Sequence, residues 1–102
     1  SNGYVSPNRP VSGNTESVFQ LNNYPNPFNP VTVIRYQIPF SSFVSLKVYD
    51  MSGKLVVTLI NKMQEAGGYD VTFDGKGLAS GTYFYSLETD QFSEIKKMVL
   101  VK

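Results

Sequence analysis

The chain has 102 residues, a formal net charge of +1 at pH 7, and a composition that is 41% hydrophobic and 14% aromatic. This size suits one domain with a filled core, and the balanced charge gives no reason to expect nucleic acid as a partner. The sequence lacks Cys and His, which excludes disulfides, Cys/His zinc sites and the usual general base, so we expect no catalytic site, metal ion or cofactor.

Residues 1–18 are polar and rich in Ser, Asn, Pro and Gly. This composition predicts a flexible linker or tail, followed by one domain over residues 19–102. The segment has no apolar core of the kind that a signal peptide needs. No apolar run elsewhere approaches the ~20 residues of a transmembrane helix, so no membrane span is predicted.

Three prolines dominate the segment Tyr24-Pro25-Asn26-Pro27-Phe28-Asn29-Pro30. Each proline ring fixes its own φ at about −65° and pushes the preceding residue toward extended geometry. The segment is therefore predicted to be rigid and extended, with Phe28 as an anchor. The same composition, taken alone, also fits a proline-rich linker.

Alternating apolar residues predict the first strands. Residues 19–21 predict a short edge strand, and residues 31–38 and 43–50 predict two longer ones. The expected inward faces carry Ile34, Tyr36 and Ile38, and then Val44, Leu46 and Val48. After a turn signal at residues 50–53, residues 54–60 predict another strand, whose broken alternation indicates a bulge or burial on both faces. Residues 61–68 predict a loop.

The second half of the chain continues the pattern. Residues 69–74 predict a strand, and the glycine-rich residues 75–81 predict a loop in which Leu78 plugs the core. Residues 82–89 and 92–101 predict a hairpin closed by Asp90-Gln91, with Met98 and Leu100 on one face. About seven short strands separated by turn signals predict an all-β fold, an immunoglobulin-like β-sandwich of two antiparallel sheets.

The carboxylates offer two candidate chemistries. Asp70 and Asp74 share one face of a predicted strand about 13 Å apart, which is too far for paired glycosidase carboxylates and indicates ordinary solvated charges. Asp50, Asp74 and Asp90 fall near loop ends, where Ca²⁺ could bind, but no run resembling a calcium loop supports such a site.

The aromatic residues offer a third candidate. The chain has seven Tyr and seven Phe, and most of them fall on inward faces, where core packing accounts for them. Four fall elsewhere: Phe40, Phe43, Tyr49 and Phe84. If these four lie together on the surface, they form a contact patch.

Five motifs, in order, resemble one family. They are Asn23 to Pro30 followed by Thr32, Ile34-Arg35-Tyr36 and Ile38-Pro39; Val44 to Asp50 with Gly53-Lys54; Ala66-Gly67 with Tyr69, Val71 and Phe73; Leu78 to Tyr85, including Gly81; and Lys97 to Lys102. Over residues 19–102 the pattern resembles the type A C-terminal sorting domain of the type IX secretion system of Bacteroidetes. It is also similar to the immunoglobulin-like domain of the flagellar hook-capping protein. One departure is Phe73, where relatives often carry Trp.

The resemblance implies a targeting function without catalysis. Such domains direct an N-terminal cargo protein across the outer membrane, are recognised by the type IX machinery, and are often removed by a surface sortase, which leaves the cargo at the cell surface or secreted. Residues 1–18 would then contain the cleavage zone. The resemblance also implies that the recognition signal lies in the terminal residues Lys96, Lys97, Met98, Val99, Leu100, Val101 and Lys102.

Two alternatives stay open. The edge of the terminal strand is a candidate for pairing with another sheet, yet Met98 and Leu100 also fit simple completion of the core. The rival function is a carbohydrate- or protein-binding accessory module of a secreted enzyme or adhesin. Such a module would present clustered aromatic side chains, such as Phe43, Tyr49 and Phe84.

Overall fold

The computed structural model describes residues 18–102. The predicted linker over residues 1–18 therefore lies, except for its last residue, outside the described residues. Within the described part the chain forms seven strands: β1 (Gln20–Tyr24), β2 (Val31–Ile38), β3 (Ser42–Tyr49), β4 (Leu55–Gln64), β5 (Gly67–Asp74), β6 (Gly81–Thr89) and β7 (Phe92–Leu100).

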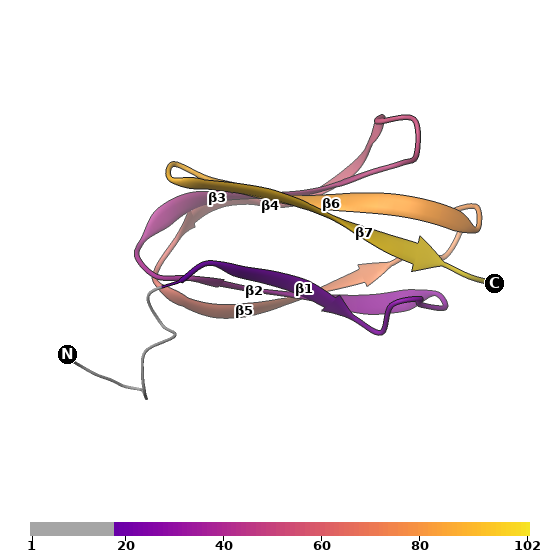
Figure 1. Cartoon of the computed structure of the whole chain (residues 1–102), viewed down its shortest axis with the longest axis horizontal. Helices are drawn as coiled ribbons and strands as arrows, with labels where there is room; N and C mark the ends of the chain where they lie inside the picture. The colour runs from indigo at the N-terminus through magenta and orange to yellow at the C-terminus, as the bar shows by residue number, and fades with distance from the viewer. Residues whose placement is uncertain (1–17) are drawn as a thin grey trace.

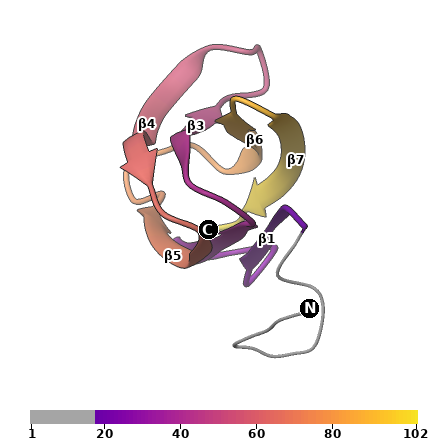
Figure 2. The same ribbon diagram turned by 90° about the vertical axis from the view of Figure 1, so that its left-hand side faces the viewer.

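The strands form two facing layers (Figure 1). One sheet has the order β1-β2-β5 and the other the order β4-β3-β6-β7, and every pairing between these strands is antiparallel. Seen along the strands, the four-stranded sheet curves over the smaller one (Figure 2). The links at residues 39–41, 65–66 and 75–80 carry the chain from one sheet to the other. The predicted all-β sandwich is confirmed.

The core lies between the two layers and is lined by the predicted inward faces. Ile34, Tyr36 and Ile38 of β2 are buried against Val44, Leu46 and Val48 of β3, and against the inward residues of β6 and β7. Period-2 alternation placed these side chains correctly because each sheet has one face turned to the core and one to solvent. Leu78 of the β5–β6 loop packs against the same core, as expected.

The fourth strand differs from its prediction in one respect. β4 continues to Gln64, and β5 begins at Gly67, so most of the loop expected over residues 61–68 is strand. The reason is that β4 is an edge strand whose polar side chains at Asn61 and Lys62 face solvent, so polarity there did not mean a turn. The predicted bulge is present twice, because Leu59 and Val56 are extra residues opposite β3.

A tyrosine corner fixes the start of β6. The Tyr83 hydroxyl donates to the carbonyl oxygen of Ala79, four residues upstream, at 2.7 Å. This arrangement is a hallmark of immunoglobulin-like sandwiches, and it went unnoticed in the sequence. Gly81, between these two residues, has φ +151°, a value that L side chains rarely adopt. The motif glycine is therefore required by backbone geometry.

Candidate functional site

The predicted signal residues lie on β7 and just beyond it, and they divide into two groups. Met98 and Leu100 are buried in the core. Val99 is half-buried, and the remaining four, Lys96, Lys97, Val101 and Lys102, are exposed. A partner that meets the folded domain can therefore contact the lysines and Val101 directly, whereas Met98 and Leu100 act by holding the strand in place.

The outer edge of β7 is closed over its last residues by the proline segment. The Phe28 amide donates to the Val99 carbonyl oxygen, and the Val101 amide donates to the Phe28 carbonyl oxygen, both at 2.9 Å. The Asn26 side chain accepts from the Val99 amide at 3.0 Å and donates to the Lys97 carbonyl oxygen at 3.1 Å. We call the segment Asn26–Phe28 the clasp. The clasp leaves less of the β7 edge free to pair with a strand of another protein, because it already occupies this edge from Lys97 to Val101.

The clasp follows from the chemistry of its residues. A proline has no N–H and cannot continue a strand ladder, so Asn26 supplies the missing donor and acceptor from its side chain. Phe28, with 1% of its surface exposed, is the predicted anchor. Its ring meets that of Phe73 edge-on, with centroids 6.0 Å apart. The Phe28 side chain therefore ties the clasp to the core while its backbone pairs with β7.

A network of hydrogen bonds connects the clasp to both sheets. Asn23 Oδ1 accepts from the Tyr85 hydroxyl at 2.9 Å and from Asn26 Nδ2 at 3.3 Å. Asn23 Nδ2 donates to Thr32 Oγ1 at 3.1 Å, and the Thr32 hydroxyl donates to the Pro25 carbonyl oxygen at 2.8 Å. The buried hydroxyls of Thr32 and Tyr85 are thereby both paired, as burial requires.

The phenol of Tyr85 stays a donor across the physiological range. Burial raises its pKa to about 12, and the negative charge of Glu94 adds to the increase. The hydrogen bond from β6 to Asn23 of β1 therefore persists at any pH at which a cell operates.

Sequence reasoning missed Asn23 and Thr32 as members of this network. Thr32 carried a usable signal, since it shares the inward face of β2 with Ile34 and Tyr36 and is itself fully buried. A polar residue at an inward position needs a partner. Asn23 carried no such signal, because its partners come from β2, β6 and the proline segment.

The carboxylates are engaged in local structure. Asp70 accepts two hydrogen bonds from Arg35, at 2.8 and 3.1 Å, and the hydrogen-bonded guanidinium lowers the pKa of Asp70. The Ser52 hydroxyl and the turn amides lower the pKa of Asp50. Asp74 accepts from the Lys76 amide at 2.9 Å. Asp90 lies in the predicted two-residue hairpin turn, which the structure confirms. Among the described residues no three side chains of metal-ligand type gather.

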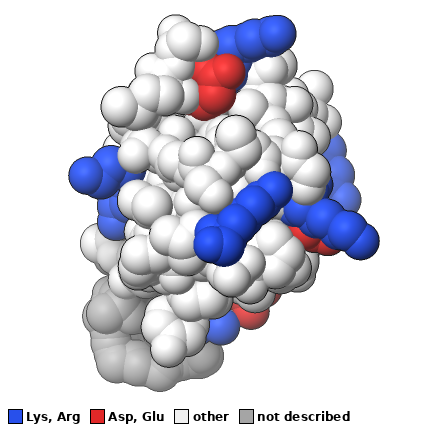
Figure 3. Space-filling view, turned by 90° about the vertical axis from the view of Figure 1, so that its right-hand side faces the viewer, with Lys and Arg blue, Asp and Glu red and all other residues white. Residues whose placement is uncertain are grey.

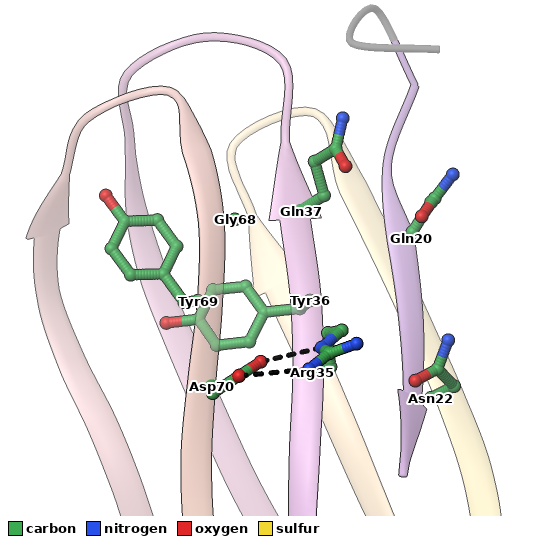
Figure 4. Close-up of a pocket in the computed structure, with 8 residues that line it drawn as sticks. All are labelled: Gln20, Asn22, Arg35, Tyr36, Gln37, Gly68, Tyr69 and Asp70. Carbon is green, nitrogen blue, oxygen red and sulfur yellow. Dashed lines mark hydrogen bonds and ion pairs between the residues drawn. The ribbon is translucent and has the colours of Figure 1, made fainter.

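A shallow cavity of about 320 Å³ lies on the outer face of the three-stranded sheet (Figure 4). It is lined by Gln20 and Asn22 of β1, by Arg35 and Gln37 of β2, and by Asp70 of β5, among others. The Arg35–Asp70 ion pair is part of this lining. These groups can hydrogen-bond a polar ligand, but the lining offers no nucleophile with an adjacent base.

The four outward aromatic residues do not form one patch. Phe40 meets Phe19 edge-on at 5.8 Å, and Phe19 in turn stacks on Phe92. Tyr49 and Phe84 are register partners on β3 and β6. Phe43 lies six residues from Tyr49 on the same strand, about 20 Å away. The condition for a shared contact patch is therefore not met, because β3 carries Phe43 and Tyr49 to opposite ends of one face.

Comparison with known proteins places this fold in context. The model of the family described as the secretion system C-terminal sorting domain matches residues 22–102. No curated protein matches. A solved structure of PorZ, described as an essential bacterial surface component of the type-IX secretion system of Porphyromonas gingivalis, is similar with a TM-score of 0.55 and 19% identity. The match covers 80% of this chain and 11% of that one, so it shows the fold alone.

Proposed function

The chain belongs to the family of secretion system C-terminal sorting domains, and from this membership we propose that it is the address of a larger secreted protein, recognised in its folded form by the type IX outer-membrane machinery. The observation that carries the proposal is the family match over residues 22–102, nearly the whole described structure. Sorting through type IX secretion leads to the cell surface or the exterior.

Finer features of the proposal concern what is attached to the domain. The cargo precedes residue 19, residues 1–18 form the linker, and a surface sortase cleaves within it. The domain itself is not an enzyme. Support comes from the absence of Cys and His in the sequence, and from the engagement of Asp50, Asp70 and Asp74 in hydrogen bonds of turns and ion pairs. The described residues contain no helix long and apolar enough to cross a membrane.

The terminal lysines are the proposed points of contact. Lys96, Lys97 and Lys102 are exposed, while the clasp and the two buried neighbours fix the course of the strand between them. A rigid strand presents its charges in one arrangement, which lowers the entropic cost of recognition. An accessory binding module is less well supported, since Phe43 lies apart from Tyr49 and Phe84.

The test is export of a reporter in a bacterium with type IX secretion. A signal peptide and a soluble fluorescent protein precede residues 1–102. Deletion of residues 97–102 is unsuitable as the negative arm, because it removes Met98 and Leu100 from the core and would unfold the domain. We use the double charge reversal Lys97→Glu with Lys102→Glu, and Lys62→Glu as the control at an exposed site on β4.

We expect the wild-type and Lys62→Glu reporters to reach the surface or medium, and the double variant to stay in the periplasm. The mass of the exported reporter locates the cleavage position, which we expect within residues 1–18. A wild-type reporter that folds but remains in the periplasm contradicts the sorting function. Export of the double variant at the wild-type level would remove the terminal lysines from the signal.

A further inference from the structure

An apolar hollow of about 380 Å³ lies on the outer face of the four-stranded sheet, lined by Tyr49, Gly53, Phe84 and Ile95. Tyr49 and Phe84 are opposite each other across β3 and β6. Ile95 of β7 is 63% exposed, an unusual position for so apolar a side chain. Leu55, which pairs with Tyr49, extends the apolar surface beyond the hollow.

Three lysines lie near this hollow in register or along the chain. Lys97 is the register partner of Phe84, and Lys54 follows Gly53 directly in the chain. Lys47 pairs with Ser86, which in turn pairs with Ile95. Viewed from the end that carries the C-terminus, Lys and Arg side chains project at several points around the molecule (Figure 3). A negatively charged partner is therefore attracted to this part of the surface.

Three acidic residues lie near the hollow, but none of them lines it. Glu88 of β6 pairs with Ser93, two residues from Ile95, and Glu94 precedes Ile95 but falls on the opposite face of β7 by alternation, whereas Asp90 lies in the β6–β7 turn. Asp50 is near as well, and its carboxylate keeps its charge but is held in its own turn by hydrogen bonds from the amides of Ser52 and Lys54. On the outer face, the charged residues closest in register to Tyr49 and Phe84 are nevertheless Lys47 and Lys97.

We propose that this hollow is the docking site by which the sorting machinery holds the domain, and that it accepts an apolar side chain flanked by carboxylates on a partner protein. The inference rests on the proposed sorting function and names its contact surface. Its apolar centre and charged rim match the anatomy of protein interfaces. The hollow also adjoins the terminal segment, because Lys97 is the register partner of Phe84.

Export of matched reporter variants tests the role of the hollow. Ile95→Glu places a charge in it, and Met63→Glu is the control, since both side chains are 63% exposed on the outer face of the same sheet. We expect Ile95→Glu to lower the exported fraction roughly tenfold, as for loss of a central interface contact, and Met63→Glu to export normally. Equal export of both, with wild-type stability, overturns the proposal and leaves the sorting function standing.

A titration of the purified 102-residue chain tests the chemistry without any export. The probe is a five-residue peptide with a central phenylalanine between pairs of aspartates, and its counterpart has lysines in place of the aspartates. We expect amide shifts at Tyr49, Phe84, Ile95 and Lys97 with the acidic peptide, and roughly tenfold weaker binding of the basic one. Equal binding of the two, or shifts elsewhere, overturns the proposal.

The two experiments separate the possible failures. If the wild-type reporter is not exported while the acidic peptide binds at Ile95, the sorting function fails and the chemistry of the hollow is supported. If Ile95→Glu does not fold, Lys97→Glu tests the rim in its place, with Lys62→Glu as control.

A third experiment measures binding of the purified chain to vesicles that contain a phosphorylated glycolipid. Vesicle binding that Lys97→Glu abolishes and Ile95→Glu does not would replace the protein partner with a lipid and overturn the proposal.

Discussion

The side-chain amide of Asn26 forms hydrogen bonds with the backbone of β7 that the backbone of a neighbouring strand would otherwise form. It accepts from one β7 amide and donates to one β7 carbonyl oxygen, two residues apart along the strand. The flanking residues Pro25 and Pro27 have no N–H with which to pair. An asparagine between prolines is therefore the residue that lets a proline-rich segment close a sheet edge.

Replacing Asn26 should loosen this closure. We expect Asn26→Ala to lower the free energy of unfolding by about 1 kcal/mol, because two largely exposed hydrogen bonds are lost, and to speed hydrogen exchange at the Val99 amide. Thermal melting and exchange measured by NMR check both effects. Asn29→Ala is the control, since Asn29 is exposed in the same motif. Equal effects of the two substitutions would argue against the clasp.

Two tyrosines should limit stability in alkaline solution. Burial raises the pKa of Tyr36 and of Tyr85 to about 12, against an ordinary value of 10.0. The unfolded chain therefore releases these protons first, so their contribution to stability is complete below pH 10 and is lost as the pH rises to about 12. Melting temperatures from pH 8 to 12 should fall over this interval, and less so in the Tyr36→Phe, Tyr85→Phe double variant. A flat profile would contradict the prediction.

At the scale of the elements, the sequence predicted what depends on neighbours along the chain. Alternation located β2 and β6 and their inward faces, since a sheet with one buried face repeats every two residues. The hairpin turn at Asp90 was found in the same way. The end of β4 was missed because an edge strand accepts polar residues on its solvent side.

The candidate site was harder to predict than the strands. The clasp, residues 26–28, pairs with residues 97–101. A pattern of neighbouring residues cannot predict which distant strand edge a proline-rich segment will cover. The hollow likewise depends on the register between β3, β6 and β7. The sequence identified Phe28 as an anchor and the terminal lysines as candidates, but not the contact between those two segments.

The β5–β6 loop approaches the clasp closely at Gly75. A Cβ added there would lie 3.1 Å from Leu100 Cδ2, 3.2 Å from the Pro30 carbonyl oxygen and 3.3 Å from Phe28 Cε2. We expect Gly75→Ala to destabilise the domain by about 1–3 kcal/mol through this crowding. Gly68→Ala, which meets nothing within 4 Å, should have little effect. Chemical denaturation measures the free energy of unfolding of both variants. Equal values would show that the loop rearranges around the added methyl group without loss of stability.

At the scale of the whole molecule, one core unites all seven strands. We therefore expect a chain of residues 18–102 to unfold in a single transition within about 2 °C of the full chain. A chain that begins at residue 25 lacks β1, with buried Leu21 and the network residue Asn23, and should melt far lower. Calorimetry distinguishes these outcomes. A large loss of stability in the first truncation would place part of the domain before residue 18.

The clasp lies early in the chain and pairs with β7, the last strand. This pairing has a consequence for biosynthesis. Phe28 emerges from the ribosome long before Val99 and Leu100, and until they follow, its backbone has no partner and its ring lacks part of its packing. We expect a polypeptide truncated upstream of Leu100 to leave this domain incomplete, because both the buried Leu100 side chain and the backbone partners of Phe28 are then missing. A protein that bears a closed domain has consequently been translated through to its last strand. A folded domain therefore reports that translation has passed its last strand, β7.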